Sequence, residues 1–370
     1  MTGANLTAGQ AGKLPVRAAA ATHFNLRPDR LSSMREEIIE PDLPIIDPHH
    51  HLWDRDWRYL LDELIGDVGS GHNIRSTVYV QATSMYRASA PSEWQSLGET
   101  EFANGVAAMS ASGAYGEFRA CAGIVGYVDL MLGDRAALVL DRHIEAAGSR
   151  LKGIRNSSVW DPDPSIVTTR RQPPRGLLAD RSFREGFALL EARRLSFDAW
   201  LYHPQISELR DLARAFPGAT IILDHVGAPL GVGSYANRRA EVFSHWRRDM
   251  QALAECPNVN VKLGGLGMPV MGFGFDTMAV APSSEILAEA WRPYFDLCIE
   301  VFGTRRCMFE SNFPVDKQAC SYGIVWNAFK RCASGLSASE KADLFNDTAT
   351  RVYRLDEPDP RASALRGSCE

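Results

Sequence analysis

The chain has 370 residues, of which 45% are apolar and 23% are charged, and its formal net charge is -5 at pH 7. This balance is typical of a globular enzyme with enough apolar residues for a large core, and it excludes disorder over the whole chain. The slightly acidic composition provides no basic field for nucleic acid or an anionic membrane, so we expect a small-molecule substrate and neither of those partners.

Cysteines and apolar runs bear on location. The seven cysteines are scattered and never show C-x-x-C spacing, so the sequence predicts neither a disulfide framework nor a thiolate zinc site. No apolar run approaches the roughly 20 residues of a membrane-spanning helix. We therefore expect a cytoplasmic protein. A homo-oligomer is compatible with the sequence, which does not determine the oligomeric state.

Three regions follow one another along the chain. Residues 1–42 are rich in Ala, Thr and Arg without an apolar period, which predicts an N-terminal arm that is partly ordered. In residues 43–356, short apolar or β-branched runs alternate with amphipathic segments of helix length, the pattern of strand–helix units on a parallel sheet. Residues 357–370 are predicted to form a C-terminal tail.

Eight strands are predicted within residues 43–356. They are Leu43 to Asp47, Ser76 to Ala82, Ala120 to Val128, Leu151 to Arg155, Leu195 to Leu201, Thr220 to Asp224, Asn258 to Leu263 and Arg306 to Glu310. Eight units favour an α/β fold with a single (β/α)₈ TIM barrel. The alternative, an open doubly wound sheet, is disfavoured because no glycine-rich phosphate-binding motif follows the first strand.

Two helix starts carry the spacing of a capping box. Ser182 with Glu185 precedes one apolar-periodic segment, and Ser337 with Glu340 precedes another near the end of the chain. These devices support helices between the strands.

Three consecutive histidines end the first strand. Because side chains alternate along a strand, His49 and His51 point to one face and His50 to the other. Two imidazoles on one face at a strand end can converge on one ion or one substrate oxygen, which favours a functional role over an accidental cluster.

Two further histidines follow strands, His203 after the fifth and His225 after the sixth. Each alone could be a core histidine bonded to a backbone carbonyl, and that interpretation stays open. Their recurrence at the same end of the predicted barrel favours an active site at the C-terminal rim.

Ordered motifs then identify a family. They are Asp47-x-His49-x-His51 at the first strand, Asp224 to Gly227 at the sixth, Lys262 to Leu266 at the seventh, Met308 to Pro314 at the eighth, and the closing segment Asn346 to Leu355. Over about residues 43–355 the chain resembles the amidohydrolase-related family of the amidohydrolase superfamily. Within it, the sugar-lactonase and 2-pyrone-4,6-dicarboxylate-lactonase branch is the most similar.

The resemblance implies an amidohydrolase-like TIM barrel that opens a lactone or related cyclic carbonyl substrate by attack of water. It implies a divalent metal that some members need and others do not. A neighbouring branch of metal-dependent decarboxylases has similar histidines, so a lyase acting on a small aromatic or unsaturated carboxylate is the alternative. A barrel that only binds a ligand is a third possibility, which the histidine cluster disfavours.

The eighth strand departs from the family pattern. The family usually has an aspartate there as general base, whereas this chain has Asn312, and an amide cannot take up a proton at neutral pH. Glu310 is the nearest carboxylate on the same face by strand parity. Two interpretations stay open: Glu310 replaces the base, or it is a structural acid paired with Arg155 or Lys262.

The resulting site prediction has three parts. The catalytic residues are His49, His51, His225, Glu310 and Asn312, the substrate-binding residues are Arg155, Tyr202, Lys262 and Trp53, and any metal is held by His49, His51 and His203. Because Asn312 replaces a usual carboxylate ligand, we expect either no required cofactor or a weakly held divalent metal, with zinc preferred. The glycine- and methionine-rich segment from Gly264 to Phe275 is a candidate lid.

Overall fold

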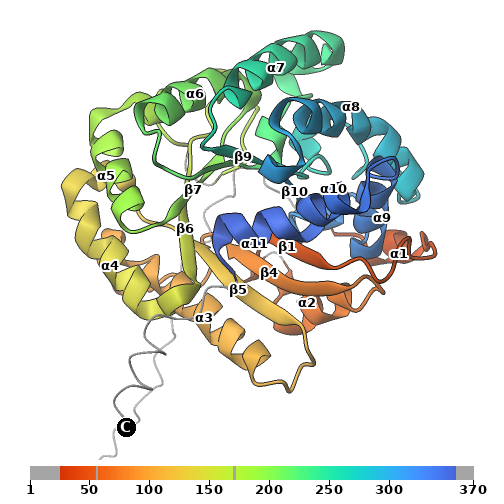
Figure 1. Cartoon of the computed structure of the whole chain (residues 1–370), viewed down its shortest axis with the longest axis horizontal. Coiled ribbons are helices and arrows are strands. Elements are labelled where there is room, and N and C mark those ends of the chain that lie inside the picture. Colours follow the sequence, from red (N-terminus) through yellow and green to blue (C-terminus); the bar gives the residue numbers. More distant parts are fainter. Residues whose placement is uncertain (1–25, 56, 170–171, 356–370) are drawn as a thin grey trace, which may run out of the picture.

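The computed structural model describes residues 26–55, 57–169 and 172–355, which form a barrel of parallel strands surrounded by helices (Figure 1). The eight barrel strands are β1 (Ile45–His50), β4 (Ile74–Val80), β5 (Arg119–Gly126), β6 (Leu151–Ser157), β7 (Ser196–Trp200), β8 (Ile221–Leu223), β9 (Val259–Leu263) and β10 (Cys307–Phe309). They are hydrogen-bonded in chain order, as expected when each strand is followed by a right-handed crossover. All eight predicted strands are therefore present, and the predicted fold class is confirmed.

Helices surround the barrel, and the last of them lies across its centre in Figure 1. They are α1 (Pro28–Ser32), α2 (Leu61–Val68), α3 (Leu97–Ala111), α4 (Ala136–Ala147), α5 (Arg181–Ala192), α6 (Ile206–Ala215), α7 (Arg239–Ala254), α8 (Ser284–Phe302), α9 (Tyr322–Cys332), α10 (Ala338–Ala342) and α11 (Thr348–Tyr353). A small hairpin of β2 (Trp53–Asp54) and β3 (Arg58–Tyr59) follows the first barrel strand.

The barrel closes at its C-terminal mouth. Among the described residues no strand ladder joins β10 to β1. Instead, the backbone N–H of Asn312 donates to the His49 carbonyl at 3.0 Å, and the backbone N–H of His51 donates to the Phe313 carbonyl at 2.7 Å. The two ends of the sheet therefore meet at the histidines of the first strand.

Side chains fill the barrel interior, and some of them pack against the last helix. Inward residues such as Val78, Val125 and Ile222 pack with Val352 and Tyr353 of α11, and α11 lies across the centre of the barrel in Figure 1. A helix in this position covers apolar side chains that would otherwise meet water.

One of the two predicted helix starts is confirmed. Ser337 and Glu340 form the expected capping box at α10. The prediction for Ser182 and Glu185 is wrong, because α5 starts earlier and the carboxylate of Asp180 accepts from the Ser182 and Phe183 amides instead. A short Asp carboxylate caps a helix as well as a Ser hydroxyl does, so spacing alone could not decide between them.

The predicted N-terminal arm falls partly within the described residues. Residues 1–25, like the predicted tail, lie outside them. Arg30 of α1 is buried, and its guanidinium donates to the carbonyls of Met278 at 2.8 Å and Gln318 at 2.9 Å. This arginine thereby joins the loops that follow β9 and β10. No helix in the described part of the chain has the length and apolarity needed to cross a membrane.

Candidate active site

The first strand presents its histidines through a bulge. The register of β1 against β4 shifts between Asp47 and His50, which opposes Asp47 to Thr77 and His50 to Tyr79. His50 therefore points out of the barrel, where its Nε2 lies 2.9 Å from the Thr77 hydroxyl. The rings of His49 and His51 meet on the inside, with their Nε2 atoms 3.2 Å apart. The parity predicted from the sequence thus holds for all three histidines.

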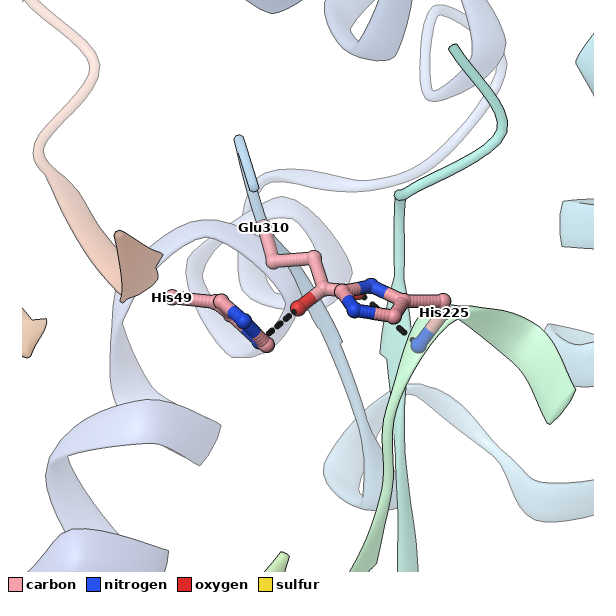
Figure 2. Close-up of side chains that lie close together, drawn as sticks. All are labelled: His49, His225 and Glu310. Atoms are coloured by element: carbon pink, nitrogen blue, oxygen red, sulfur yellow. Dashed lines mark hydrogen bonds and ion pairs between the residues drawn. The ribbon is translucent and has the colours of Figure 1, made fainter. Parts of the chain in front are cut away.

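Glu310 lies between two imidazoles, as Figure 2 shows. Its Oε2 is 2.6 Å from Nδ1 of His49, and its Oε1 is 2.7 Å from Nδ1 of His225. The backbone amide of His225 also donates to Oε1, at 3.0 Å. The carboxylate follows β10 and is fully buried, so it fixes both rings but does not reach solvent.

A network of buried charges continues below His49. The Lys262 ammonium is 2.7 Å from Asp198 Oδ2 and 3.0 Å from Asp224 Oδ1, and it is 3.2 Å from His49 Nδ1. On the other side of His49, Arg155 places Nη1 3.3 Å from His49 Nε2 and 3.5 Å from Asp224 Oδ2. Paired charges of this kind are how a protein interior tolerates ionised groups.

This network shifts pKa values in a consistent direction. Burial alone would raise the pKa of Glu310, but the imidazoles of His225 and His49 hold it at about 2. Burial, reinforced by the Lys262 ammonium, lowers the pKa of His49. Burial would also lower the pKa of Lys262, yet the carboxylates of Asp198 and Asp224 raise it above its usual value. At neutral pH the site therefore contains an ionised Glu310, a neutral His49 and a charged Lys262.

The turn after β8 is strained where it carries His225. His225 and Val226 both have left-handed backbone conformations, with φ of 56° and 47°, and such a conformation is a true outlier for a β-branched residue. Gly265 packs against this turn, and a Cβ at that glycine would lie 2.4 Å from His225 Nδ1. Strain of this kind is found at functional sites, where the surrounding structure holds it.

A cavity of about 970 Å³ opens above these residues. Its wall includes His51, Trp53, Arg155, Trp200, His225 and Asn312, together with Met268 to Val270 of the predicted lid segment. The Nε of Arg155 is buried and has no hydrogen-bond partner among the described residues. Arg155 lines the cavity, so its guanidinium can donate to an oxygen atom of a bound ligand.

The amide at the eighth strand has a specific neighbour. Asn312 has φ of 53°, and its Nδ2 donates to Asp316 Oδ1 at 2.8 Å. The other carboxylate oxygen of Asp316 accepts from the Gly267 amide at 2.9 Å. Burial raises the pKa of Asp316 to about 7, against the lowering effect of these hydrogen bonds and of the nearby His225 imidazole. An amide at position 312 therefore avoids placing two buried acids side by side.

Five predicted residues do not line the cavity: His49 and Glu310, which lie beneath it, and His203, Tyr202 and Lys262. His203 begins a turn after β7, where its Nδ1 accepts from the Leu230 amide at 3.2 Å, so the structure does not bring it to His49 and His51 as a third metal ligand. Tyr202 binds Thr168 through its hydroxyl at 2.7 Å, and Thr168, not Tyr202, lines the cavity. Lys262 is fully buried beneath His49 and contacts carboxylates instead of a substrate.

Three residues of the network were missed by the sequence prediction. Asp224 belongs to the motif at the sixth strand, and Asp198 is an acid inside an otherwise apolar strand, which is a signal of buried pairing. Tyr353 donates to Asp198 Oδ2 at 2.6 Å from the far end of the chain, and no local pattern indicates that contact.

His49, His225 and Glu310 are residues of the kind that bind metal ions, but the charges around them disfavour one. The ligand-type atoms of His49, His225 and Glu310 lie within 4.8 Å of one another, and two imidazoles with one carboxylate are typical zinc ligands. However, each ring nitrogen of His49 already faces a cation of the chain, Lys262 or Arg155. A divalent ion bound to His49 would be repelled by both cations, so the described residues do not fit a resident metal.

Comparison with known proteins identifies the family. A family model described as amidohydrolase matches residues 46–355. The uncharacterised protein y4mH of Sinorhizobium fredii is 34% identical over 337 residues, which cover 85% of this chain and 99% of that protein. An L-fucono-1,5-lactonase of Burkholderia multivorans is 29% identical over 238 residues, which cover 64% of this chain and 73% of the lactonase.

Solved structures share the fold. An amidohydrolase from Burkholderia multivorans with bound zinc superposes with a TM-score of 0.65 at 24% identity, covering 84% of this chain and 99% of that one. A structure assigned as a 2-pyrone-4,6-dicarboxylic acid hydrolase from Pseudomonas putida superposes with a TM-score of 0.57 at 17% identity, covering 85% and 99%. The chain therefore belongs to the amidohydrolase family and, within it, resembles the lactonase-like branch.

Proposed function

We propose that the protein hydrolyses a lactone at the C-terminal mouth of the barrel, with His225 as the general base. The observation that carries this proposal is the pairing of His225 on the cavity wall with Glu310 buried behind it. Because Nδ1 of His225 is bonded to Glu310, Nε2 is the nitrogen left to meet water from the cavity. A carboxylate that orients an imidazole in this way fixes its tautomer and stabilises the imidazolium that forms.

This assignment separates the two candidates for the missing base. Glu310 is fully buried and its two oxygens are directed to His225 and His49, so it acts on the reaction through those rings. Glu310 is then a positioning residue, and His225 is the catalytic residue. Asn312 lies on the cavity wall but carries no titratable group.

The carbonyl would be held by Arg155, which lines the same cavity. The Nε of Arg155 lacks a hydrogen-bond partner among the described residues and is a donor for the carbonyl oxygen. A fixed donor of this kind stabilises the negative charge that develops on that oxygen when water attacks.

His225 can carry out both proton transfers of the hydrolysis. The water oxygen bonds to the carbonyl carbon while His225 takes the water proton. The ring C–O bond breaks, and the leaving ring oxygen receives that proton from the imidazolium. The product is the open-chain hydroxy acid, formed with no step that requires a metal.

The cavity wall favours a ring that carries polar substituents. Trp53 and Trp200 provide flat apolar surfaces, and Gln81, Asn156 and Thr168 provide amide and hydroxyl groups. Charged side chains also line the cavity, namely Arg55, Glu93, Asp129 and Arg155. Aromatic faces with several hydrogen-bonding groups suit a hydroxylated ring such as a sugar lactone. The L-fucono-1,5-lactonase of Burkholderia multivorans, a relative by sequence, is consistent with this class.

The decisive experiment screens the purified protein against sugar lactones, muconolactones, pyrones and aromatic carboxylates. Proton release and carbon dioxide are followed separately in every reaction. Lactone-dependent acid release without carbon dioxide is the expected result. Carbon dioxide from an aromatic or unsaturated carboxylate, with no acid release from any lactone, would instead establish the decarboxylase chemistry that the sequence left open.

A further inference from the structure

Lys262 occupies a position where the donor atoms of a metal site would converge. Its ammonium lies within 3.2 Å of Asp198 Oδ2, Asp224 Oδ1 and His49 Nδ1, and the side chain is fully buried. Two carboxylates and an imidazole are donors that proteins use to bind divalent ions. In this chain they surround a cation that the sequence itself provides.

A second cation closes the opposite side of the same groups. Arg155 Nη1 faces His49 Nε2 at 3.3 Å and Asp224 Oδ2 at 3.5 Å. Both ring nitrogens of His49 and both carboxylate oxygens of Asp224 therefore face positively charged groups. The Glu310 carboxylate also contacts His49 Nδ1, at 2.6 Å. A divalent ion bound to His49 or Asp224 would nevertheless lie close to the two fixed positive charges, which repel it.

The ammonium is also held from below. Tyr353 of α11 donates to Asp198 Oδ2 at 2.6 Å, which orients the carboxylate that binds Lys262. The ring of Tyr353 lies 5.6 Å from the Lys262 ammonium, within reach of a cation–π interaction. The lysine is thus fixed by strand β7, the turn after β8 and the last helix.

We propose that the Lys262 ammonium is the resident cation of this site, where it takes the place of a divalent metal ion and excludes zinc. In this role it holds Asp224 and the neutral His49 in position without providing an open coordination site. The proposal depends on the buried charges alone and not on the identity of the substrate. Its consequence is that removal of the ammonium creates a divalent-metal site from groups already present.

The test compares zinc binding by the wild type and by Lys262→Met, whose side chain keeps length and apolar volume but lacks the charge. Affinity is measured by competition with a chromophoric chelator. We expect the variant to bind one equivalent of zinc at least about 10²-fold more tightly than the wild type, because a repelling charge within a few Å is removed. Zinc should also raise the thermal midpoint of the variant and not that of the wild type.

A matched control is Lys330→Met. Lys330 is equally buried, but its ammonium donates to the carbonyls of Ile39 and Glu40, outside the barrel. This variant should lose stability without any gain in zinc affinity. A gain equal to that of Lys262→Met would show that the effect is unspecific and would overturn the proposal.

Loss of Lys262 leaves two buried carboxylates without their counter-ion, which can prevent folding. The double variant Lys262→Met with Asp198→Asn removes one of those charges and keeps an acceptor for Tyr353. Folding of the single variant only in the presence of zinc supports the proposal, as does tight zinc binding by the folded double variant. Zinc binding by folded variants no tighter than that of the wild type would overturn it. So would one equivalent of zinc that stays on the wild type through extended chelator dialysis. Because the readout is metal binding, failure here is distinguishable from failure of the lactone screen.

Discussion

The positioning role of Glu310 can be tested by replacing one oxygen of its carboxylate. Glu310→Gln keeps the size of the side chain but replaces one acceptor by an NH₂ group, which cannot accept from His49 or His225. We expect kcat to fall by at least about 10²-fold, the usual value of a positioned acid–base group, while the fold is retained. Steady-state kinetics with a lactone substrate and circular dichroism measure the two effects.

A buried carboxylate elsewhere provides the control. Glu99 accepts from Tyr79 and from two backbone amides, away from the histidines. Glu99→Gln should cost stability and leave kcat within a few-fold of the wild type. If Glu310→Gln behaves in the same way, Glu310 is only structural.

Asn312 provides a second test at the residue scale. In Asn312→Asp, two buried carboxyl groups would lie where Nδ2 now meets Asp316 Oδ1 at 2.8 Å. Their folded-state pKa values would be raised above the unfolded value near 3.9, so the stability is present at low pH and is lost as the pH rises through the folded pKa. Because burial already raises the pKa of Asp316 to about 7, the thermal midpoint should fall further below the wild type at pH 8 than at pH 6.

Asn346→Asp is the matched control for this pair. Asn346 also donates to a neighbouring aspartate at 2.8 Å, but on the surface, where water screens the repulsion. Its midpoint should change little between the two pH values.

Asn312→Asp can also be added to Glu310→Gln, and partial recovery of kcat would show that the two positions share a role. Equal loss of stability at pH 6 and pH 8 would contradict the predicted buried acid pair.

At this scale the sequence predicted directions better than distances. Strand parity correctly placed His49 and His51 inside and His50 outside, because the side chains keep alternating through the bulge of β1. It could not predict that His203 leaves the rim, since the chain turns directly after β7. Lys262 was expected at a substrate, but its depth depends on carboxylates from two other strands, which no single motif contains.

Gly265, which follows β9, packs directly against His225 in the site. Gly265 has φ of 68°, and an added Cβ would lie 2.4 Å from His225 Nδ1, so Gly265→Ala should displace the ring from Glu310. We expect kcat to fall at least about 10²-fold together with the loss of that hydrogen bond. Kinetics and thermal unfolding of the purified variant measure the outcome.

Gly113→Ala is the control for Gly265→Ala, because it introduces the same backbone strain without a steric clash. Gly113 has φ of 80°, yet nothing lies within 4 Å of a Cβ placed there. This variant should show the conformational cost of a left-handed alanine, about 1 kcal/mol, and normal kcat. Similar kcat values for the two variants would mean that Gly265 is needed only for its backbone conformation.

Elements were predictable in proportion to their length and period. The eight barrel strands could be recognised because each is an apolar run bounded by polar turns. The two-residue strands of the β2–β3 hairpin and the contacts of α1 could not, because such short segments have no period to read. The start of α5 was misplaced because Asp180 competes with Ser182 as the cap.

For the whole molecule, buried histidines predict instability in acid. Burial lowers the pKa to about 3 for His50 and to about 4 for His72, His143 and His203. Above about pH 7.5 these groups are neutral in both states, so they have no effect. As the pH falls from 6.5 to 4, the unfolded chain takes up protons that the folded chain does not, and stability is lost.

Buried acids act in the opposite direction. Burial raises the pKa of Asp47 to about 6 and that of Asp316 to about 7, so these groups gain protons in the folded state first and stabilise it as the pH falls. Burial also raises the pKa of Glu99 and Asp198 and lowers that of His49 and His51. Six histidines therefore outweigh four carboxyl groups, and we expect the urea midpoint to fall between pH 7 and pH 5. His143→Gln should reduce that fall, and a midpoint that rises over this range would contradict the prediction.

The seam between β10 and β1 has a kinetic consequence. Asp47 accepts hydrogen bonds from Ser311 across 264 positions of the chain, and the backbones of His49 and His51 are hydrogen-bonded to residues that follow β10. Contacts so distant in sequence form late, because a long loop must close before they contribute. In a refolding experiment, recovery of enzyme turnover should therefore coincide with the slowest phase. Secondary structure should return earlier, in species that are compact but inert.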